Sequence, residues 1–223
     1  APRISVVVPV YKTPETFLRE MVDSVLNQTY GNVELCLADG SGEDHGPQKI
    51  LEAYAAQDPR IRYEKLPKNL GIAGNTNAAL DLATGEYVAL LDHDDFLEEH
   101  ALFELVKWLQ THPEADMIYT DEDKVSFDSA TFFQPHFKPD FNPDLLRTNN
   151  YICHFLMVKR TLMEQAGKYR ESFDGAQDYD FILRCSELAQ EIDHIPRVLY
   201  HWRCHPTSTA GNPESKMYAY EAG

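Results

Sequence analysis

Two kinds of segment alternate along the first half of the chain. A β-branched apolar run at residues 4–9 is typical of a strand buried on both faces of a sheet, and the runs 33–38, 61–66 and 87–91 also read as strands. Apolar residues recur at helical spacing in the segments that follow these runs, at 13–26, 50–54, 72–83 and 101–109. Four such strand–helix units predict an α/β fold, with a mostly parallel central sheet flanked by helices and right-handed crossovers.

The second half of the chain is less regular. Its pattern predicts strands at 116–120, 151–159 and 192–202 and an amphipathic helix at 179–189. Residues 128–150 are rich in Phe, Pro, Asp and Asn without periodicity, as in a long functional or mobile loop. Because neither a repeat nor a low-complexity linker interrupts the chain, we expect one mixed α/β domain with a small antiparallel part in this half.

Charge restricts the classes of partner. The chain carries 36 acidic and 20 basic residues, a net charge of −16, so nucleic acid or an anionic membrane surface would repel it. A small anionic ligand remains compatible if a metal ion compensates its charge. No apolar stretch approaches the roughly 20 residues of a transmembrane segment.

Cellular location and chain limits are also indicated by the sequence. The scattered cysteines fit reduced thiols in the cytoplasm better than a disulfide framework. The chain opens at Ala1, and residues 218–223 read like the start of a helix, so we expect an excised domain of a longer protein.

The strongest chemical signal is the run Leu90-Leu-Asp92-His-Asp94-Asp95, in which an apolar strand leads directly into three carboxylates. In an extended segment, Asp92 and Asp94 point to the same side, an arrangement that suits a hard divalent ion such as Mg²⁺ or Mn²⁺. A solvated acidic turn that caps the following helix through Asp95 and Glu98 is the alternative.

Other polar positions each have a functional and a structural interpretation. The cluster Asp121-Glu122-Asp123 follows a short strand, where it forms either part of a site or an exposed turn. Asp39, at the end of the second strand, either accepts hydrogen bonds from a base or ribose or closes an Asx turn. Asp178 is either a general base or a helix N-cap, and His201 is either a metal ligand or a buried histidine.

The segment Asn69-Leu-Gly71-Ile-Ala-Gly74 precedes a helix, where backbone N–H groups favour phosphate. It lacks the G-x-G-x-x-G spacing, which disfavours a dinucleotide fold. Cys204 and His205 beside His201 hint at zinc, but the Cys-x₂-Cys spacing of structural zinc sites is absent.

In combination these motifs resemble glycosyltransferase family 2, and the resemblance covers essentially the whole chain. The motifs occur in the order that this family uses: Val6-Val-Val-Pro-Val-Tyr11, Ser24-Val-Leu-Asn-Gln-Thr-Tyr30, Leu37-Ala-Asp39, Asn69-Leu-Gly71, Leu91-Asp-His-Asp-Asp95, Gln177-Asp178 and Tyr200-His-Trp-Arg203. The Asp-Glu-Asp-Lys run at 121–124 and Asn-Tyr-Ile-Cys-His at 150–154 resemble transferases of bacterial O-antigen, cell-wall and cell-surface polysaccharide synthesis.

The resemblance implies a GT-A fold with a nucleotide-binding half at 1–115 and an acceptor-binding half at 116–223. It implies an inverting transfer that uses a nucleotide-diphosphate sugar and Mn²⁺ or Mg²⁺, with Asp92-His-Asp94 as the DXD motif. The donor residues it implies are Pro9, Tyr11, Asp39, Asn69, Gly71, Asp92 and Asp94, of which Asp39 reads the base of a UDP- or dTDP-sugar. The metal ligands are Asp94 and His201, and the general base is Asp178. Acceptor contacts are Asp121, Glu122, Asp123, Gln177 and Trp202.

Two further functions are compatible with the residues. One is a nucleotidyltransferase on a similar sheet, although the basic Gly-rich loop that it needs after the first strand is missing. The other is a non-catalytic sugar- or nucleotide-binding module, because many members of the family have Glu-Asp where this chain has Gln177-Asp178. On the transferase interpretation, the acceptor is a glycan or a lipid-linked glycan, handled in the cytoplasm or at the inner face of the membrane.

Overall fold

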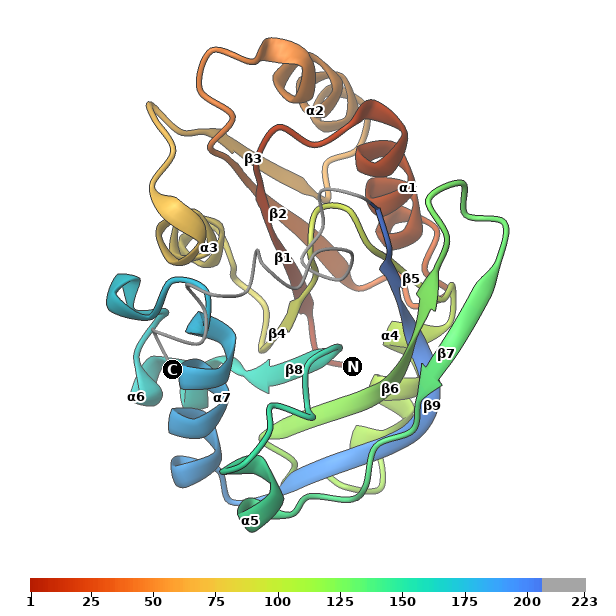
Figure 1. Ribbon diagram of the computed structural model, residues 1–223, viewed down its shortest axis with the longest axis vertical. Coiled ribbons are helices and arrows are strands. Elements are labelled where there is room, and N and C mark those ends of the chain that lie inside the picture. The colour runs from red at the N-terminus through yellow and green to blue at the C-terminus, as the bar shows by residue number, and fades with distance from the viewer. Residues whose placement is uncertain (206–223) are drawn as a thin grey trace.

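The computed structural model of the protein describes residues 1–205, arranged as one sheet with helices on both faces (Figure 1). The strands are β1 (Ile4–Val10), β2 (Val33–Asp39), β3 (Ile61–Lys65), β4 (Tyr87–Leu90), β5 (Phe96–Leu97), β6 (Met117–Val125), β7 (Phe132–His136), β8 (Leu156–Lys159) and β9 (Ile192–Arg203). The helices are α1 (Glu15–Leu26), α2 (His45–Gln57), α3 (Gly71–Asp81), α4 (Ala101–Leu109), α5 (Pro143–Leu146), α6 (Arg160–Ala166), η1 (Glu171–Phe173) and α7 (Gln177–Leu188). The helix expected at 218–223 lies outside the described residues.

The sheet has the order β3-β2-β1-β4-β8-β6-β9-β5, with β7 paired to β6. Its first four strands are parallel, in a register that places Ile4 beside Val33 and Val10 beside Asp39. Strand β8 runs antiparallel to both β4 and β6, and β6 and β9 are parallel to each other. The predicted α/β class and the antiparallel part in the second half are therefore confirmed, and one continuous sheet joins the two halves.

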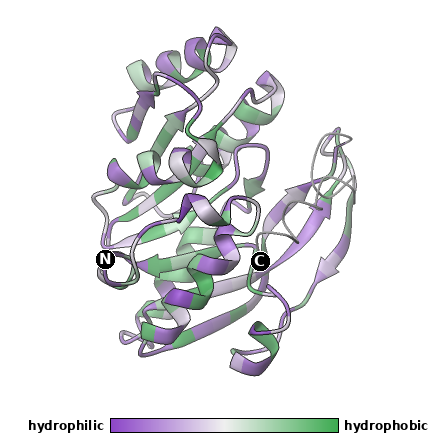
Figure 2. Ribbon diagram, turned by 60° about the vertical axis from the view of Figure 1, so that its left-hand side comes forward, coloured by the Kyte–Doolittle hydropathy of each residue, from purple (hydrophilic) through white to green (hydrophobic). Residues whose placement is uncertain are grey.

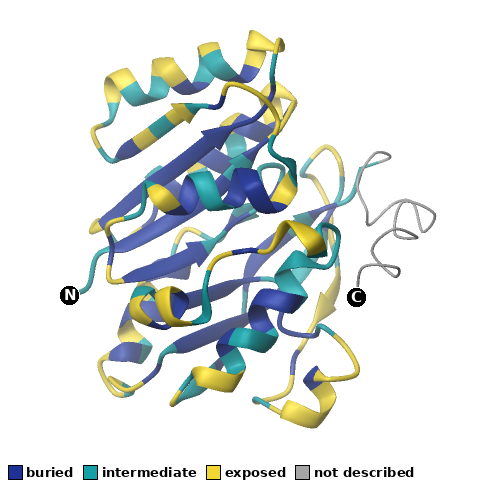
Figure 3. Ribbon diagram, turned by 90° about the vertical axis from the view of Figure 1, so that its left-hand side faces the viewer, coloured by how far each residue is buried: buried dark blue, intermediate teal, exposed yellow. Residues whose placement is uncertain are grey.

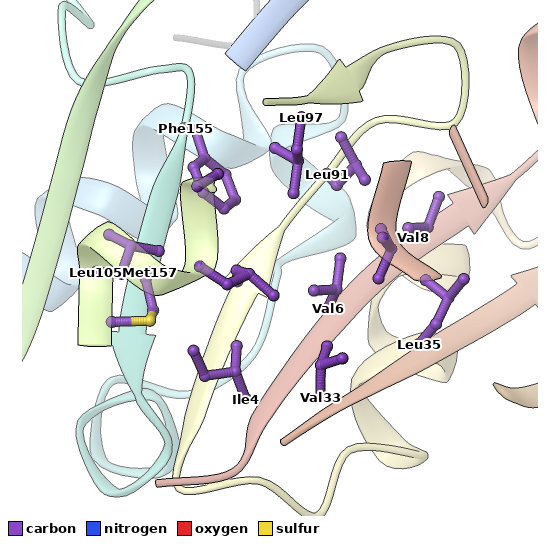
Figure 4. Packing of buried hydrophobic residues seen from close by; sticks show 14 of the residues in the cluster. Ile4, Val6, Val8, Val33, Leu35, Leu91, Leu97, Leu105, Phe155 and Met157 are labelled. Atoms are coloured by element: carbon purple, nitrogen blue, oxygen red, sulfur yellow. The ribbon is translucent and has the colours of Figure 1, made fainter. Parts of the chain in front are cut away.

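The core lies on both faces of this sheet because successive residues of a strand point to opposite sides. From β1, Val6 and Val8 pack with buried residues of α1, α2 and α4, whereas Val7 packs with those of α3, α6 and α7. Figure 4 shows part of the first cluster, including Phe155 and Met157. Figure 3 shows the central strands as buried, with exposed positions on the outward sides of the helices, and Figure 2 shows the matching hydropathy.

A buried carboxylate ties together the strands at one end of the sheet. Glu34 of β2 accepts hydrogen bonds from Ser5 Oγ of β1 at 2.6 Å and from the Thr84 backbone N–H at 2.6 Å. Its other oxygen forms ion pairs with Arg62 of β3 at 2.9 Å and Arg3 at 3.3 Å. Burial alone would raise the pKa of the Glu34 carboxyl, but these hydrogen bonds and charges hold it below its usual value.

The second half departs from the sequence-based prediction in its short elements. The loop expected at 128–150 contains β7 and α5, and the strand expected at 151–159 is confined to β8. Helix α6 and the two-residue strand β5 carry no periodic signal long enough to be recognised. Strand β6 continues to Val125, so residues 121–123 lie within it and the exposed turn considered for them is wrong.

Candidate active site

A cavity of about 550 Å³ is lined by residues from both halves of the chain. Its walls come from the ends of β1 and β4, the first turns of α3 and α7, the segment that precedes β8, and strands β6 and β9. This is the position, beyond the carboxyl ends of parallel strands, at which open α/β sheets bind ligands. Six residues of the predicted site line it: Pro9, Asp92, Glu122, Gln177, Asp178 and Trp202.

A second cavity, of about 310 Å³, is lined by residues of the loops after β1, β2 and β3. The predicted donor residues Tyr11 and Asn69 belong to it. Gly71, the third residue expected in this region, is the first residue of α3 and has a φ of 78°. Its N–H donates to Asn69 Oδ1 at 3.1 Å, so Gly71 shapes the loop that carries Asn69.

Asp39 lies at the end of β2, next to this second cavity, but its carboxylate is fully buried. One oxygen accepts the Ser41 N–H at 2.9 Å, which is the Asx turn considered from the sequence. The other accepts from Tyr63 Oη at 3.0 Å and from Lys65 Nζ at 3.1 Å. Because both oxygens are engaged, Asp39 holds the walls of the second cavity in place, and a direct contact with a base stays a prediction.

The acidic segment after β4 forms a turn in which each of the three carboxylates contacts a different partner. Asp92 lies 3.5 Å from His154 Nε2, and Asp94 lies 2.8 Å from His205 Nε2. Asp95 is buried, and it accepts hydrogen bonds from Tyr200 Oη and the Arg203 backbone N–H. The interpretation in which Asp95 caps the next helix is wrong, since the N-cap of α4 is His100 and no side chain caps it.

These different surroundings give the carboxylates different ionisation behaviour. Burial, together with the nearby charges of Asp94 and Asp92, raises the pKa of Asp95 well above its usual value. Partial burial also acts against ionisation of Asp92, but hydrogen bonding and the charge of His154 hold its pKa below the usual value. The side chain of Asp92 is 49% exposed, so this carboxylate is available to a ligand in the 550 Å³ cavity.

Each of the three acidic residues 121–123 of β6 contacts a different histidine. Asp121 Oδ1 lies 2.8 Å from His194 Nε2 of β9, and Asp123 Oδ1 lies 2.6 Å from His201 Nδ1. Glu122 Oε2 lies 3.1 Å from His154 Nδ1. Of the three acidic residues, Glu122 lines the cavity, whereas Asp121 and Asp123 do not.

His201 does not contact Asp94, with which it was expected to bind a metal. Its second ring nitrogen lies 3.1 Å from Glu98 Oε1, and its ring packs against Phe96 and Phe132. These contacts match the alternative in which His201 is a satisfied, buried histidine. The metal role of His201 therefore stays a prediction that the contacts do not favour.

The residues around Asp94 fit a divalent cation as a partial site. Asp94 and His205 supply an oxygen and a nitrogen that already lie within hydrogen-bond distance of each other. Within residues 1–205, no group of three or more His, Cys, Asp or Glu side chains is arranged to hold a metal ion. A cation at Asp94 and His205 would therefore take its remaining ligands from water or from a phosphate-bearing substrate.

Asp178 is in the first turn of α7 and faces the cavity. It is not the N-cap of this helix, which is Ala176, so the capping interpretation is wrong. Asp178 Oδ1 accepts the Tyr179 N–H at 2.9 Å, and Oδ2 accepts a hydrogen bond from Cys153 Sγ at 3.1 Å. Neither of these hydrogen bonds comes from a positively charged group. The Asp178 carboxylate is therefore a candidate proton acceptor for a bound hydroxyl group.

Sequence reasoning missed His154 and Cys153 as members of the site, and it named His205 only with His201 and Cys204 as a hint of zinc. The segment Asn-Tyr-Ile-Cys-His at 150–154 was singled out as a motif, but nothing in its spacing shows that Cys153 and His154 contact Asp178 and Asp92. These contacts join residues far apart in the sequence and depend on how β8 and β9 enter the sheet.

Within residues 1–205, no helix combines the length and the apolar character that crossing a bilayer requires.

Comparison with known proteins gives a consistent result. Residues 5–167 match the family described as glycosyl transferase family 2. An uncharacterized protein of Sinorhizobium fredii is 48% identical over 224 residues, which cover 100% of this chain and 24% of that protein. The O-antigen biosynthesis protein RfbC of Myxococcus xanthus is 38% identical over 222 residues, which cover 100% of this chain and 17% of that protein. This chain therefore spans about a quarter or less of the length of these relatives.

Solved structures share the fold. The S. aureus TarS structure in complex with UDP superimposes with a TM-score of 0.76 at 21% sequence identity, covering 92% of this chain and 61% of that one. The TarS complex with UDP-GlcNAc gives a TM-score of 0.79 at 20% identity and covers 99% of this chain and 64% of that one. A mannosyltransferase of Pyrobaculum calidifontis, in complex with GDP-Man and Mn²⁺, gives 0.68 at 22% identity and covers 90% of this chain and 56% of that one.

Proposed function

Because this chain belongs to glycosyltransferase family 2, we propose that it is an inverting, metal-dependent transferase that uses a UDP- or dTDP-sugar. The observation that carries the proposal is the 550 Å³ cavity, whose carboxylates include Asp92 and Asp178 in different surroundings. Asp92 comes from the end of a parallel strand, where ligands of such sheets bind. Asp178 comes from a helix start that also faces the cavity.

The two carboxylates have separate tasks in such a transfer. Asp92 accepts hydrogen bonds from hydroxyl groups of the donor, namely those of its ribose or sugar. Asp178 accepts the proton of the acceptor hydroxyl as that oxygen attacks the anomeric carbon. A positioned base of this kind contributes about 10²–10⁴ in rate.

Asp94 and His205 are the residues that would hold the divalent cation. When bound, a cation there offsets the negative charge that develops on the diphosphate leaving group. The Arg203 side chain fixes this segment from behind, because its Nε donates to the Asp94 carbonyl at 2.8 Å and its guanidinium lies over the Phe17 ring at 4.3 Å. The Asp94 backbone is therefore held by contacts that do not depend on the cation.

We propose a glycan or a lipid-linked glycan of cell-surface polysaccharide synthesis as the acceptor. Support comes from the relatedness to the O-antigen biosynthesis protein RfbC and from the aromatic wall residue Trp202. Aromatic rings offer flat apolar faces against which sugar rings pack.

A hydrolysis screen tests this function without knowledge of the acceptor. The chain is incubated with UDP-, dTDP-, GDP- and ADP-sugars, with Mn²⁺, with Mg²⁺ or with chelator, and released nucleotide is measured. We expect metal-dependent release from uridine or thymidine donors. Nucleotide binding without hydrolysis, in the presence of acceptor glycans, would instead favour a non-catalytic module.

Three variants distinguish the metal ligands. We expect His205→Ala and Asp94→Asn to remove the increase in UDP affinity that Mn²⁺ produces, as measured by titration calorimetry. His201→Ala should retain the Mn²⁺-dependent increase because the imidazole contacts Asp123 and Glu98 instead. The opposite pattern would restore His201 as the ligand.

A further inference from the structure

His154 lies in the wall of the 550 Å³ cavity between two carboxylates. Its Nδ1 is 3.1 Å from Glu122 Oε2, and its Nε2 is 3.5 Å from Asp92 Oδ2. The His154 backbone N–H also donates to Glu122, so Glu122 holds this residue at two points. The His154 ring therefore links the side chains of Glu122 and Asp92.

The plane of the His154 ring is fixed by aromatic neighbours. The ring stacks on Tyr200 with a centroid distance of 5.0 Å and an interplanar angle of 11°, and Trp202 lies 5.3 Å away. Tyr200 also accepts the backbone N–H of Asp92 on its hydroxyl oxygen at 3.4 Å. The same tyrosine therefore contacts both the histidine ring and the backbone of the residue that the ring approaches.

Glu122 is buried and held in place by its neighbours. Its side chain is 7% exposed, and Lys138 and His136 lie 3.7 Å from its two oxygens. Burial alone would raise the pKa of Glu122, but these neighbours and His154 hold it below its usual value. Asp92, at the other end, is 49% exposed. The Glu122 side chain is thus buried, whereas the Asp92 side chain is open to the cavity.

We propose that His154, held by Glu122, is a positioning residue that orients the Asp92 carboxylate toward hydroxyl groups of the nucleotide-sugar donor. This inference rests on the function proposed above. It changes the assignment of Glu122, because the carboxylate that was expected to contact the acceptor instead acts through His154 on the donor side. Orientation of one carboxylate by a buried partner matters because small displacements of a binding group lower the affinity for the ligand.

A second histidine of the protein supplies a matched control. His194 pairs with Asp121, the neighbour of Glu122 in β6, and stacks on Tyr119 with a centroid distance of 4.9 Å and an interplanar angle of 17°. Neither His194 nor Asp121 lines the cavity. The two histidines have the same kind of partners, but only His154 contacts Asp92.

The test is a double-mutant cycle on the full chain, with UDP and UDP-GlcNAc as probes in the presence of Mn²⁺. The variants are Asp92→Asn, His154→Phe, the corresponding double variant, His154→Gln and His194→Phe, each with a measured thermal midpoint. Phe retains a ring that can stack on Tyr200 but removes the contacts of both ring nitrogens, the hydrogen bond to Glu122 and the ion-pair contact with Asp92, and Gln restores a donor near the position of Nε2.

We expect His154→Phe to weaken binding of at least one probe by about tenfold, and the double variant to bind no more weakly than Asp92→Asn. His154→Gln should recover most of this loss, and His194→Phe should bind within about twofold of wild type even if its midpoint falls. Losses that multiply in the double variant, or wild-type affinity in His154→Phe, would overturn the positioning role. Failure of the wild-type chain to bind either probe, and also dTDP and dTDP-sugars, would overturn the proposed function and this inference with it.

Discussion

Asp178 and Asp180 lie two residues apart at the start of α7, and their surroundings assign them different roles. Asp180 is buried and forms ion pairs with Arg170 and with Arg184, the latter at 2.8 Å. Burial acts against its ionisation, but the two arginines hold its pKa below the usual value. Asp178 contacts the thiol of Cys153 and faces the cavity. Asp180 therefore stabilises the fold, and Asp178 is available for chemistry.

We expect Asp178→Asn to lower sugar transfer by about 10²–10⁴, because an amide does not accept the acceptor's proton. Donor affinity and thermal midpoint should hardly change, since the contacts of the Asp178 carboxylate within residues 1–205 are hydrogen bonds from Cys153 and Tyr179 and include no ion pair. Transfer kinetics, donor titration and thermal unfolding measure the three quantities.

The matched variant Asp180→Asn should show the reverse pattern, with a loss of about 1–3 kcal/mol in unfolding free energy and little change in transfer at low temperature. Transfer by Asp178→Asn within about threefold of wild type would exclude Asp178 as the base.

Cys153 is expected to support Asp178 as a hydrogen-bond donor. Burial raises the pKa of the Cys153 thiol to about 12, so the sulfur stays protonated at neutral pH and donates to Asp178. We expect Cys153→Ala to lower the rate of transfer by about threefold to tenfold, as for the loss of one hydrogen bond. Cys153→Ser, which keeps a donor, should lose less, and equal losses in the two variants would contradict the role. Steady-state kinetics at saturating donor separates this effect from donor binding.

At the scale of elements, the sequence was sufficient where burial produces a long periodic pattern. Strands β1, β2 and β4 and helices α1 to α4 follow from apolar positions and helical spacing, because both faces of the sheet are covered there. Strand β3 lies at the sheet edge and alternates buried or partly buried with exposed residues. Strand β5 and α5 have two and four residues and leave no such pattern.

The acidic end of β6 was misjudged for a different physical reason. A run of three carboxylates is normally exposed, yet residues 121–123 lie within a strand because each contacts a histidine. The parallel pairing of β6 with β9 brings two of these partners, His194 and His201, into place. Contacts between distant segments also limited the prediction of the site. Motifs identified Asp92 and Asp178, but the roles of their partners His154 and Cys153 depend on tertiary contacts.

The Glu34 contacts at the end of β1, β2 and β3 predict a pH-dependent contribution to stability. The pKa of Glu34 is lower in the folded than in the unfolded chain, so its ionised form stabilises the fold above the unfolded value, about 4.3. This contribution decreases as the pH falls toward the folded pKa. We expect Glu34→Gln to lower the unfolding free energy by about 1–3 kcal/mol at pH 7.

Urea unfolding at pH 7 and at about pH 3 measures the difference between wild type and Glu34→Gln. The difference should shrink at the lower pH, because the wild-type carboxylate then loses its charge. Exposed Glu15, paired with Arg19 one helical turn away, supplies the control variant Glu15→Gln, which should change stability little at either pH. A Glu34→Gln effect that is constant with pH would show that the charge of Glu34 does not contribute.

At the scale of the whole molecule, the continuous sheet implies that the two halves unfold together. Trp108 lies in α4 in the first half of the chain, whereas Trp202 is in β9 in the second half and lines the cavity, and both pack against the same core cluster. We expect the fluorescence of Trp108→Phe and of Trp202→Phe to report the same midpoint as far-UV circular dichroism. UDP, at about 100 times its dissociation constant and with Mn²⁺ present, should raise the unfolding free energy reported by either tryptophan by the same amount, about 2.7 kcal/mol. Separate transitions would indicate two independent units.

The strand order has a consequence for how the chain folds during synthesis. Strands β1 to β4 complete their mutual pairing within the first 90 residues, but the open edge of β4 acquires its partner only at Leu156–Lys159. An unpaired edge is a template for association with another chain, so we expect truncated chains that end before β8 to aggregate. The cavity takes wall residues from Val7 to Trp202, and it is therefore completed last, when β9 joins the sheet. A growing polypeptide would therefore pair its first four strands well before it completes the cavity in which we propose that the donor binds.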